Sequence, residues 1–295
     1  MLSTTFFKLL IIFCDYTSGY KSKKEPYYDL SDHTIVTSSN VFPYVAAILE
    51  KSTYLCAGAL IAESWVLTSA DSLFLLRDSM RFLHVRLGSI NNKRGGTILP
   101  IKFFEIHPFF DDTKPEYDIA LVQLPQKVRL TPSLNPIRLQ KTMHQLITTH
   151  FIVTAWPSPE LDSEESQRLN SMESIKRRRM LSVSHLHPMD PANCSEQLED
   201  VVGTNVNLMC LEQAVGSDPC ARDAGAPVVL NGILWGIISS WKPGDCDLEA
   251  GPSFVNLVSS PNISTWIHAT VHGKSWNKHR SWLEMLDYDD DYPEE

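Results

Sequence analysis

The sequence has no hydrophobic run long enough to cross a bilayer, which takes about 20 apolar residues in a helix. The apolar stretch at the start, MLSTTFFKLLIIFC, is too short and is interrupted by Lys8. Small residues at Thr17 and Gly19 would permit signal cleavage there. We therefore expect residues 1–19 to be a secretory signal, imperfect in form, and the protein to be secreted and not membrane-spanning.

The body of the chain also lacks a strong charge excess. The formal net charge is −9, but seven acidic residues lie in the last part of the sequence, and without them the body carries only about −2. This bulk charge argues neither for nor against a nucleic-acid partner. None is predicted, because the seven tryptophans do not indicate a stacking platform for bases. The extension 272–295 ends in LDYDDDYPEE, which predicts a disordered, solubilising tail. The alternatives are sulfation of its tyrosines or docking on a basic protein surface.

Cysteine is scarce as well. Removing the signal with Cys14 would leave five of the six cysteines, an odd number that leaves one thiol unpaired. Two Asn-x-Ser sequons, at Asn193 and Asn262, fit a secretory route as candidate glycosylation sites. No metal or cofactor site is predicted.

Short β-branched segments separated by turn residues recur along the chain, among them YVAAILE, FIVTAW, VNLMCLE and PSFVNLV. Many such segments at near-regular spacing are typical of an all-β sandwich or barrel. A single good helical pattern lies near residues 260–271. Residues 20–34 are polar and tyrosine-rich, as in a linker, and residues 157–173 are expected to form a surface loop.

Several motifs occur in the order found in one enzyme family. CAGALIAESWVLTSADS, YDIALVQL, FIVTAWP and CARDAGAP, followed by ILWGIISSW, together resemble the trypsin-like (chymotrypsin-fold) serine proteases over residues 35–271. The resemblance implies two six-stranded antiparallel β-barrels with a boundary near 135–150, a cleft between them and a C-terminal helix.

The same resemblance predicts that the catalytic triad is degenerate. The family mechanism needs a serine nucleophile, a histidine base and an aspartate that orients the histidine. Asp118 matches the aspartate, whereas Asp71 stands at the histidine position and Ala224 at the serine position. A methyl group has no nucleophilic atom, and a carboxylate does not relay protons near neutral pH as imidazole does. We predict a relic site in which one of the two carboxyl groups has a raised pKa, rather than a new dyad or a metal site.

Two other parts of the family machinery also depart from the pattern. Arg222 replaces a glycine that contributes to the oxyanion hole, where losing one donor costs about 3–4 kcal/mol in the transition state. Thr34 replaces the basic residue at which active members are cleaved before Ile35. Asp223, at the position that pairs with the new terminus, is therefore expected to use Arg222 or water instead.

The family resemblance implies two disulfides, Cys194–Cys210 and Cys220–Cys246. A third family pair is replaced by Phe151 and Leu230, whose apolar contact would offset part of the loss. The fourth is half lost.

In that fourth pair Cys56 remains, but Ser72 stands at the position of its partner cysteine, so Cys56 is the predicted free thiol. It is either an inert buried group or the site of an intermolecular disulfide.

The specificity pocket of the family corresponds to Asp218, with Lys242 and Ser253 in place of wall glycines. Lys242 is expected to neutralise Asp218 and close the pocket to basic substrate side chains. The basic run Lys176–Arg179 indicates a polyanion site, a processing site or, as we favour, a solvated strand edge.

The leading hypothesis is a secreted, non-catalytic serine protease homologue that binds a protein or peptide through its cleft or rim loops. The alternatives are a hydrolase with rearranged chemistry and a structural or chaperone-like secretory protein.

Overall fold

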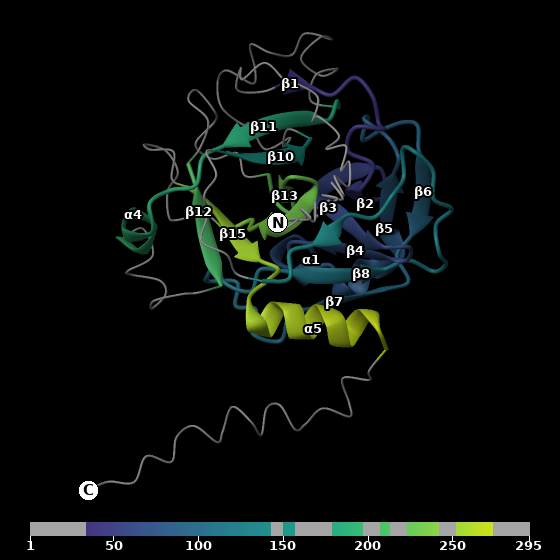
Figure 1. The fold of residues 1–295 in the computed structure, drawn as a ribbon. Coiled ribbons are helices and arrows are strands. Elements are labelled where there is room, and N and C mark those ends of the chain that lie inside the picture. The colour runs from purple at the N-terminus through teal and green to yellow at the C-terminus, as the bar shows by residue number, and fades with distance from the viewer. Residues whose placement is uncertain are drawn as a thin grey trace, which may run out of the picture.

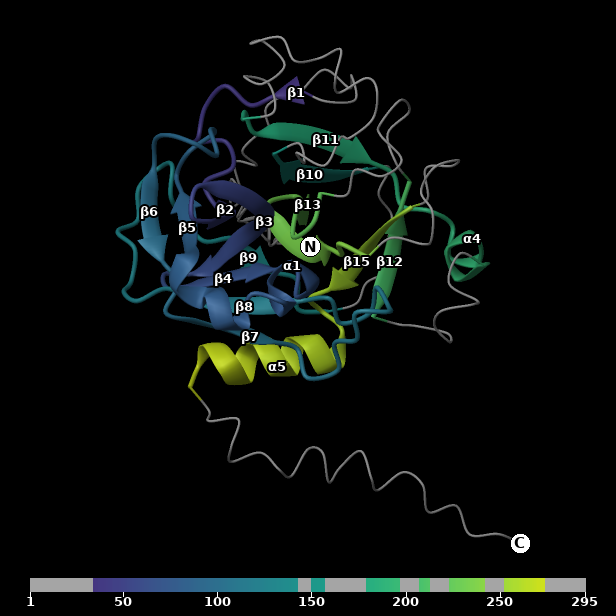
Figure 2. The same ribbon diagram turned by 180° about the vertical axis from the view of Figure 1, so that it is seen from behind.

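The computed structural model describes residues 34–142, 150–156, 179–196, 207–212, 223–241 and 252–273. Two curled antiparallel sheets lie side by side, and one helix covers the edge of the first sheet (Figures 1 and 2). The predicted signal, the predicted linker except Thr34, and nearly all of the predicted tail lie outside these ranges. The all-β prediction is confirmed.

The first sheet has the order β6-β5-β2-β3-β4-β8-β7. Its strands are β2 (Val45–Glu50), β3 (Thr53–Ala62), β4 (Trp65–Thr68), β5 (Leu83–Leu87), β6 (Thr97–Pro100), β7 (Phe103–Ile106) and β8 (Ala120–Gln123). The two outer strands, β6 and β7, are joined directly by Ile101 and Lys102. Ile101 N donates to Leu83 O on one side and Lys102 N donates to Gln123 O on the other. The sheet thus closes on itself, and counting β6 and β7 as one interrupted strand gives the six-stranded barrel that was predicted.

The second sheet has the order β1-β11-β10-β13-β14-β15-β12. Its strands are β1 (Thr34–Ile35), β9 (Arg138–Leu139), β10 (Phe151–Ala155), β11 (Ser182–Leu186), β12 (Leu208–Leu211), β13 (Pro227–Leu230), β14 (Ile233–Ile238) and β15 (Ser253–Leu257).

This sheet closes in a similar way. Beyond the end of β11, Met189 N donates to Cys210 O and Glu212 N donates to the carbonyl of His187, which brings this segment alongside β12. Six strands form the ring, and the two-residue strands β1 and β9 are additions to it. β9 pairs in parallel with β14, and is the one exception among the described strand pairs to the antiparallel pattern.

The first barrel illustrates why the strands are nearly continuous apolar runs rather than alternating ones. All four residues of β4 are buried. Val66 packs inside the first barrel, whereas Trp65 and Leu67 belong to a second cluster on the opposite face. Alternate side chains point to opposite faces of a strand, so a strand with both faces covered needs apolar residues throughout.

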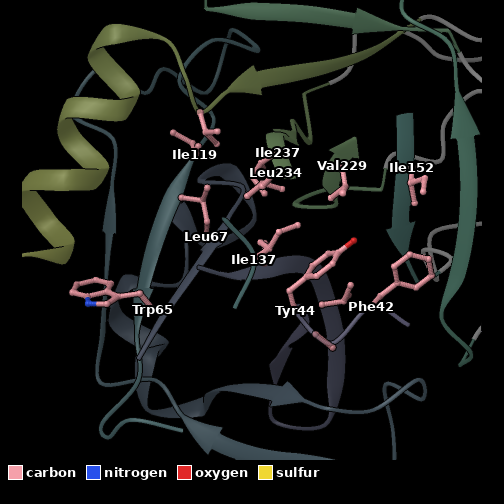
Figure 3. Close-up of a cluster of buried hydrophobic side chains, with 14 of the residues drawn as sticks. Phe42, Tyr44, Trp65, Leu67, Ile119, Ile137, Ile152, Val229, Leu234 and Ile237 are labelled. Carbon is pink, nitrogen blue, oxygen red and sulfur yellow. The ribbon is translucent and has the colours of Figure 1, made fainter. Parts of the chain in front are cut away.

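That second cluster lies between the two sheets (Figure 3). The first sheet contributes Trp65 and Leu67, together with Tyr44 just before β2. The second sheet contributes Val229 and Ile237. Burial of each such side chain contributes roughly 1.5–3 kcal/mol. This shared core fixes the two barrels against each other, and so fixes the strand ends that carry the site.

Four described helices accompany the strands. α5 (Pro261–Val271) is the predicted C-terminal helix, begins with proline after Ser260, and buries Ile263, Trp266 and Ile267. Trp266 Nε1 donates to Glu105 Oε1 over 3.3 Å, which fastens the helix to β7. The short helices were not predicted, because a helix of one or two turns shows too little periodicity. They are α1 (Asp71–Phe74), the 3₁₀ helix η1 (Arg77–Phe82) and α4 (Pro191–Glu196).

Candidate functional site

The pairing of β4 with β8 brings Asp71 and Asp118 together. Thr68 at the end of β4 lies opposite Ala120 at the start of β8. Asp71 follows β4 as the first residue of α1, and Asp118 precedes β8. The backbone N–H of Asp71 donates to Asp118 Oδ1 over 2.8 Å. Two residues far apart in sequence therefore meet where these strands end.

Asp118 is completely buried, and polar groups surround its carboxylate. Besides the Asp71 N–H, the donors come from the two residues that follow β14. Ser239 Oγ and Ser240 N each donate to Asp118 Oδ2 over 2.7 Å. Buried carboxylates are costly unless such donors compensate for lost hydration. These contacts give Asp118 a fixed position.

Ser240 connects the two carboxylates. Its hydroxyl lies within donating distance of Asp71 Oδ2, at 2.7 Å, and of Asp118 Oδ2, at 3.0 Å. Ser69 Oγ in turn donates to Ser240 Oγ over 3.3 Å. Because one hydroxyl carries one proton, Ser240 serves one carboxylate at a time. Sequence reasoning did not single out these serines, although ISSW lies directly after a family-like strand.

The side chain of Asp71 is exposed to solvent, but neighbouring protein atoms still exclude part of the water that would hydrate its carboxylate. This desolvation raises the pKa of Asp71, and the nearby charges of Asp118 and Asp112 raise it further, while the hydrogen bond from Ser240 opposes the shift. The site therefore favours the protonated form of Asp71 more than water does. Chemically, the arrangement can hold and share a proton between Asp71, Ser240 and Asp118.

Ala224 lies in a sharply turned loop before β13. Its carbonyl accepts a hydrogen bond from Ala57 N over 2.9 Å, and its side chain packs beside the core of the first barrel. The next residue, Gly225, has φ +73°, and a Cβ there would lie 2.2 Å from Ala57 O. Only glycine fits this close approach. The loop is thus held in one shape from both barrels.

Ile35 does not enter the protein interior. It lies in β1, opposite Ser182 of β11, and is 39% exposed. The charge of Asp223 acts on the buried Tyr54. Burial raises the pKa of Tyr54 well above its ordinary value, and the charges of Cys56 and Asp223 add to that shift. Arg222, the suggested partner of Asp223, lies outside the described residues.

Cys194 and Cys210 form a disulfide with Cα atoms 5.6 Å apart, the first pairing that the family resemblance implied. Cys220 and Cys246 lie outside the described residues.

Phe151 is fully buried, and Leu230 packs against the same apolar cluster, as suggested for residues that replace a disulfide.

Cys56 is a free thiol and is buried. Its Sγ lies 3.4 Å from Thr68 Oγ1. Burial raises the pKa of Cys56 to about 11, against the opposing hydrogen bonds of Thr68 and Ser72. A buried thiol that stays protonated at neutral pH is a poor nucleophile and a poor partner for disulfide exchange. The geometry favours the inert thiol over the intermolecular disulfide.

The remaining predicted residues fall partly outside the described ranges. Asp218, Lys242 and the basic residues before Arg179 are among those outside. Ser253 is buried as the first residue of β15, opposite Leu211. Arg179 is exposed just before β11, and its carbonyl accepts a hydrogen bond from Asn92 N.

In the part of the chain that the structure describes, neither a membrane-spanning helix nor a metal-binding group of side chains occurs. The longest helix found there, α5, has 11 residues, and none is both long and apolar enough to cross a membrane. Within the same ranges, no three or more His, Cys, Asp or Glu side chains are grouped so that they could hold a metal ion.

Comparison with known proteins agrees with this architecture. The family model described as Trypsin matches residues 34–267. The chain is 26% identical to Trypsin 5G1 of Aedes aegypti over 218 residues, which is 73% of this chain and 75% of that protein. It is 28% identical to Trypsin V-A of Rattus norvegicus over 233 residues, 78% of this chain and 84% of the relative.

A solved structure shows the same fold. Neuropsin, a serine protease expressed in the limbic system of mouse brain, is similar with a TM-score of 0.62 and 22% identity, covering 79% of this chain and 96% of that chain. At this identity the likeness supports the fold alone. The family model, in contrast, spans both barrels and most of α5. This chain therefore belongs to the trypsin-like serine protease family.

Proposed function

We propose that this chain is a secreted, non-catalytic member of its family that acts by binding a protein or peptide. The observation that carries the proposal is the network at the relic site. Asp71 occupies the expected base position and shares the Ser240 hydroxyl with Asp118, while Ala224 supplies only a methyl group at the expected nucleophile position. In proteases of this mechanism, losing the serine or the histidine alone lowers turnover by about 10⁶.

A binding role is supported by the part of the framework around these positions that the structure describes, where the contacts hold each residue in place. The Asp118 carboxylate keeps its donors, and the loop at Ala224 keeps a turn that only glycine allows. In this family fold the loops at the barrel ends surround the relic site, and loops on a rigid scaffold commonly carry recognition. A scaffold that holds loops in place without chemistry is suited to binding.

The test is labelling of purified full-length protein with a serine-directed fluorophosphonate, together with a peptidase assay. We expect no labelling of wild type. The double variant Asp71→His, Ala224→Ser restores the two missing triad groups but not the glycine at position 222 or the cleavage site before Ile35, so labelling of this variant would assign the loss of reactivity to the triad alone. Peptide hydrolysis by wild type that is lost in Asp71→Asn or Asp118→Asn would contradict the proposal.

The alternative function, a hydrolase with rearranged chemistry, has a candidate nucleophile in this structure. Ser240 Oγ lies 2.7 Å from the carboxylate of Asp71, so a hydroxyl and a proton acceptor are adjacent. The Ser240 backbone N–H, however, is directed at Asp118, and Asp118 also competes for the hydroxyl proton. Fluorophosphonate labelling of wild type that disappears in Ser240→Ala would favour this alternative, whereas we expect both proteins to remain unlabelled.

The partner is tested separately by cross-linking the secreted protein in medium from cells that express it. A single partner at defined stoichiometry supports the binding role. A broad set of unrelated proteins supports a chaperone-like role instead.

A further inference from the structure

Two Asn-x-Ser sequons share one motif but lie in contrasting surroundings. We infer that Asn193 carries an N-linked oligosaccharide and that Asn262 does not, because Asn262 uses its side-chain amide to hold α5 in place. The inference rests on entry into the secretory pathway, and is independent of whether the relic site is catalytic.

Asn193 lies in α4 with its side chain exposed to solvent. Its amide makes no hydrogen bond with other residues that the structure describes. The adjacent residue, Cys194, is 8% exposed and is bonded to Cys210. The disulfide therefore anchors the backbone from the inside, while Asn193 faces outward. A bulky, hydrated modification is accommodated at such a position without loss of a contact.

Asn262 is near the first turn of α5 and is only partly exposed. Its Nδ2 donates to Tyr117 Oη over 3.1 Å. The same phenolic oxygen accepts from Asn207 Nδ2 over 2.8 Å, and the Tyr117 ring stacks on buried His107 with centroids 4.6 Å apart. The Asn262 amide therefore belongs to a packed polar network that connects α5 to the loop before β8.

The modification itself involves this same nitrogen. In N-glycosylation a polyprenyl-diphosphate-linked oligosaccharide is the donor. The bond from the anomeric carbon of the sugar to the diphosphate oxygen breaks, a bond from that carbon to Nδ2 forms, and Nδ2 loses one of its two protons to a base. The polyprenyl diphosphate is the leaving group.

At Asn262 this reaction would place a sugar ring at covalent distance from the nitrogen that contacts Tyr117. The network and the docking of α5 would then be disrupted, and such a chain would fail to reach the native fold. At Asn193 no described contact is affected.

The experiment uses the full chain with its own N-terminus, expressed in a secretory cell. Treatment with a peptide N-glycosidase in heavy-oxygen water converts each modified asparagine to labelled aspartate, which peptide mass spectrometry locates. We expect the label at position 193 and none at 262. The glycosidase-sensitive band shift on a gel should disappear in Asn193→Gln and persist in Asn262→Gln.

Ser195→Ala and Ser264→Ala form a matched pair that destroys each sequon and retains its asparagine. Both hydroxyls donate to the carbonyl of a proline in the first turn of a helix, Ser195 to Pro191 over 2.9 Å and Ser264 to Pro261 over 3.1 Å. The two variants therefore lose comparable contacts, and only Ser195→Ala should remove the glycan. Asn262→Gln should in addition lower the unfolding midpoint more than Asn193→Gln does.

A label at position 262, or an unmodified Asn193 in the full chain, overturns the inference. For chain recovered from the culture medium, neither result bears on the proposed non-catalytic function, which the fluorophosphonate assay tests on unglycosylated material equally well. Absence of the chain from the medium would instead contradict the proposed secretion.

Discussion

The hydroxyl oxygen of Ser240 lies 2.7 Å from a carboxylate oxygen of Asp71, a residue 169 positions earlier in the chain. The same hydroxyl is within 3.0 Å of Asp118 Oδ2. When Asp71 is protonated, its own O–H is able to donate to Ser240, and Ser240 is then free to donate to Asp118. When Asp71 is ionised, both carboxylates compete for one proton. The pKa of Asp71 is raised because desolvation and the charges of Asp118 and Asp112 outweigh the opposing hydrogen bond from Ser240.

Asp71→Asn tests that relationship through stability. The pKa of Asp71 is raised in the folded state above its ordinary value of 3.8, so the native state binds this proton more tightly than the unfolded state does. Stability from this group is present below pH 3.8 and is lost as pH rises through the raised folded pKa. Asparagine removes the loss and still accepts a hydrogen bond from Ser240. We expect Asp71→Asn to be at least as stable as wild type at pH 7.

Urea unfolding of both proteins at pH 4 and pH 7 measures this effect. The stability of the variant relative to wild type should increase between the two conditions. A variant that loses stability relative to wild type as pH rises would mean that the fold favours ionised Asp71, in conflict with its raised pKa.

His107 predicts a second pH effect, of the opposite sign. Its ring is 2% exposed and lies against Tyr117 and Trp266. Burial lowers the pKa of His107 from 6.5 to about 4, against a weaker opposing contribution from the Asn262 backbone. Between these values the unfolded chain binds the proton and the folded chain does not, so stability falls as pH decreases from 6.5 to 4, by at most about 3 kcal/mol.

His107→Phe should flatten the stability profile over this pH range, since phenylalanine keeps the aromatic packing and does not titrate. It also loses the acceptor for Phe109 N, so its stability at pH 7 should be lower by about 1 kcal/mol. His272 is exposed to solvent, so His272→Gln is the control, and its stability should depend on pH as that of wild type does. An unchanged slope in His107→Phe would assign the acid sensitivity to other groups.

Features that depend on neighbouring residues could be predicted from the sequence, whereas contacts between distant segments could not. Period-two and continuous apolar patterns are local, so strands such as Trp65–Thr68 could be recognised directly. The meeting of Asp71, Asp118 and Ser240 depends on the pairing of β4 with β8 and on where β14 ends, which only the closed barrels determine. Family motifs indicated the two aspartates, because each stands in a recognisable segment. Ser240 has no such marker, and its role became apparent only in three dimensions.

Cys56 gives a prediction about reactivity. Its thiol is buried and has its pKa raised to about 11, so at pH 8 it should be almost entirely protonated and shielded from solvent. We expect no maleimide label on the peptide that contains Cys56 after brief treatment of native protein, and full label in denaturant. Mass spectrometry of the digested protein distinguishes Cys56 from the other cysteines. Rapid labelling of Cys56 in the native protein would show that the thiol is accessible and would favour the alternative hypothesis of an intermolecular disulfide.

Gly225→Ala tests whether the loop at Ala224 depends on its backbone shape. Gly225 has φ +73°, and a Cβ there would lie 2.2 Å from the Ala57 carbonyl oxygen and 2.5 Å from Thr68 Oγ1. Because the carbonyl is part of β3 within the first barrel, it cannot move aside at low cost. We expect a loss of about 2–4 kcal/mol in the free energy of unfolding, from the strained φ together with the displaced strand.

Gly232→Ala separates these two contributions. Gly232 has nearly the same backbone angle, φ +69°, in the turn between β13 and β14, but a Cβ there would meet no atom within 4 Å. Its loss should be confined to backbone strain, about 1 kcal/mol. Equal losses in the two variants would mean that φ alone explains the glycine at position 225. A clearly larger loss at Gly225 would show that close contact between the two barrels maintains the loop, even though Ala224 beside it carries no nucleophile.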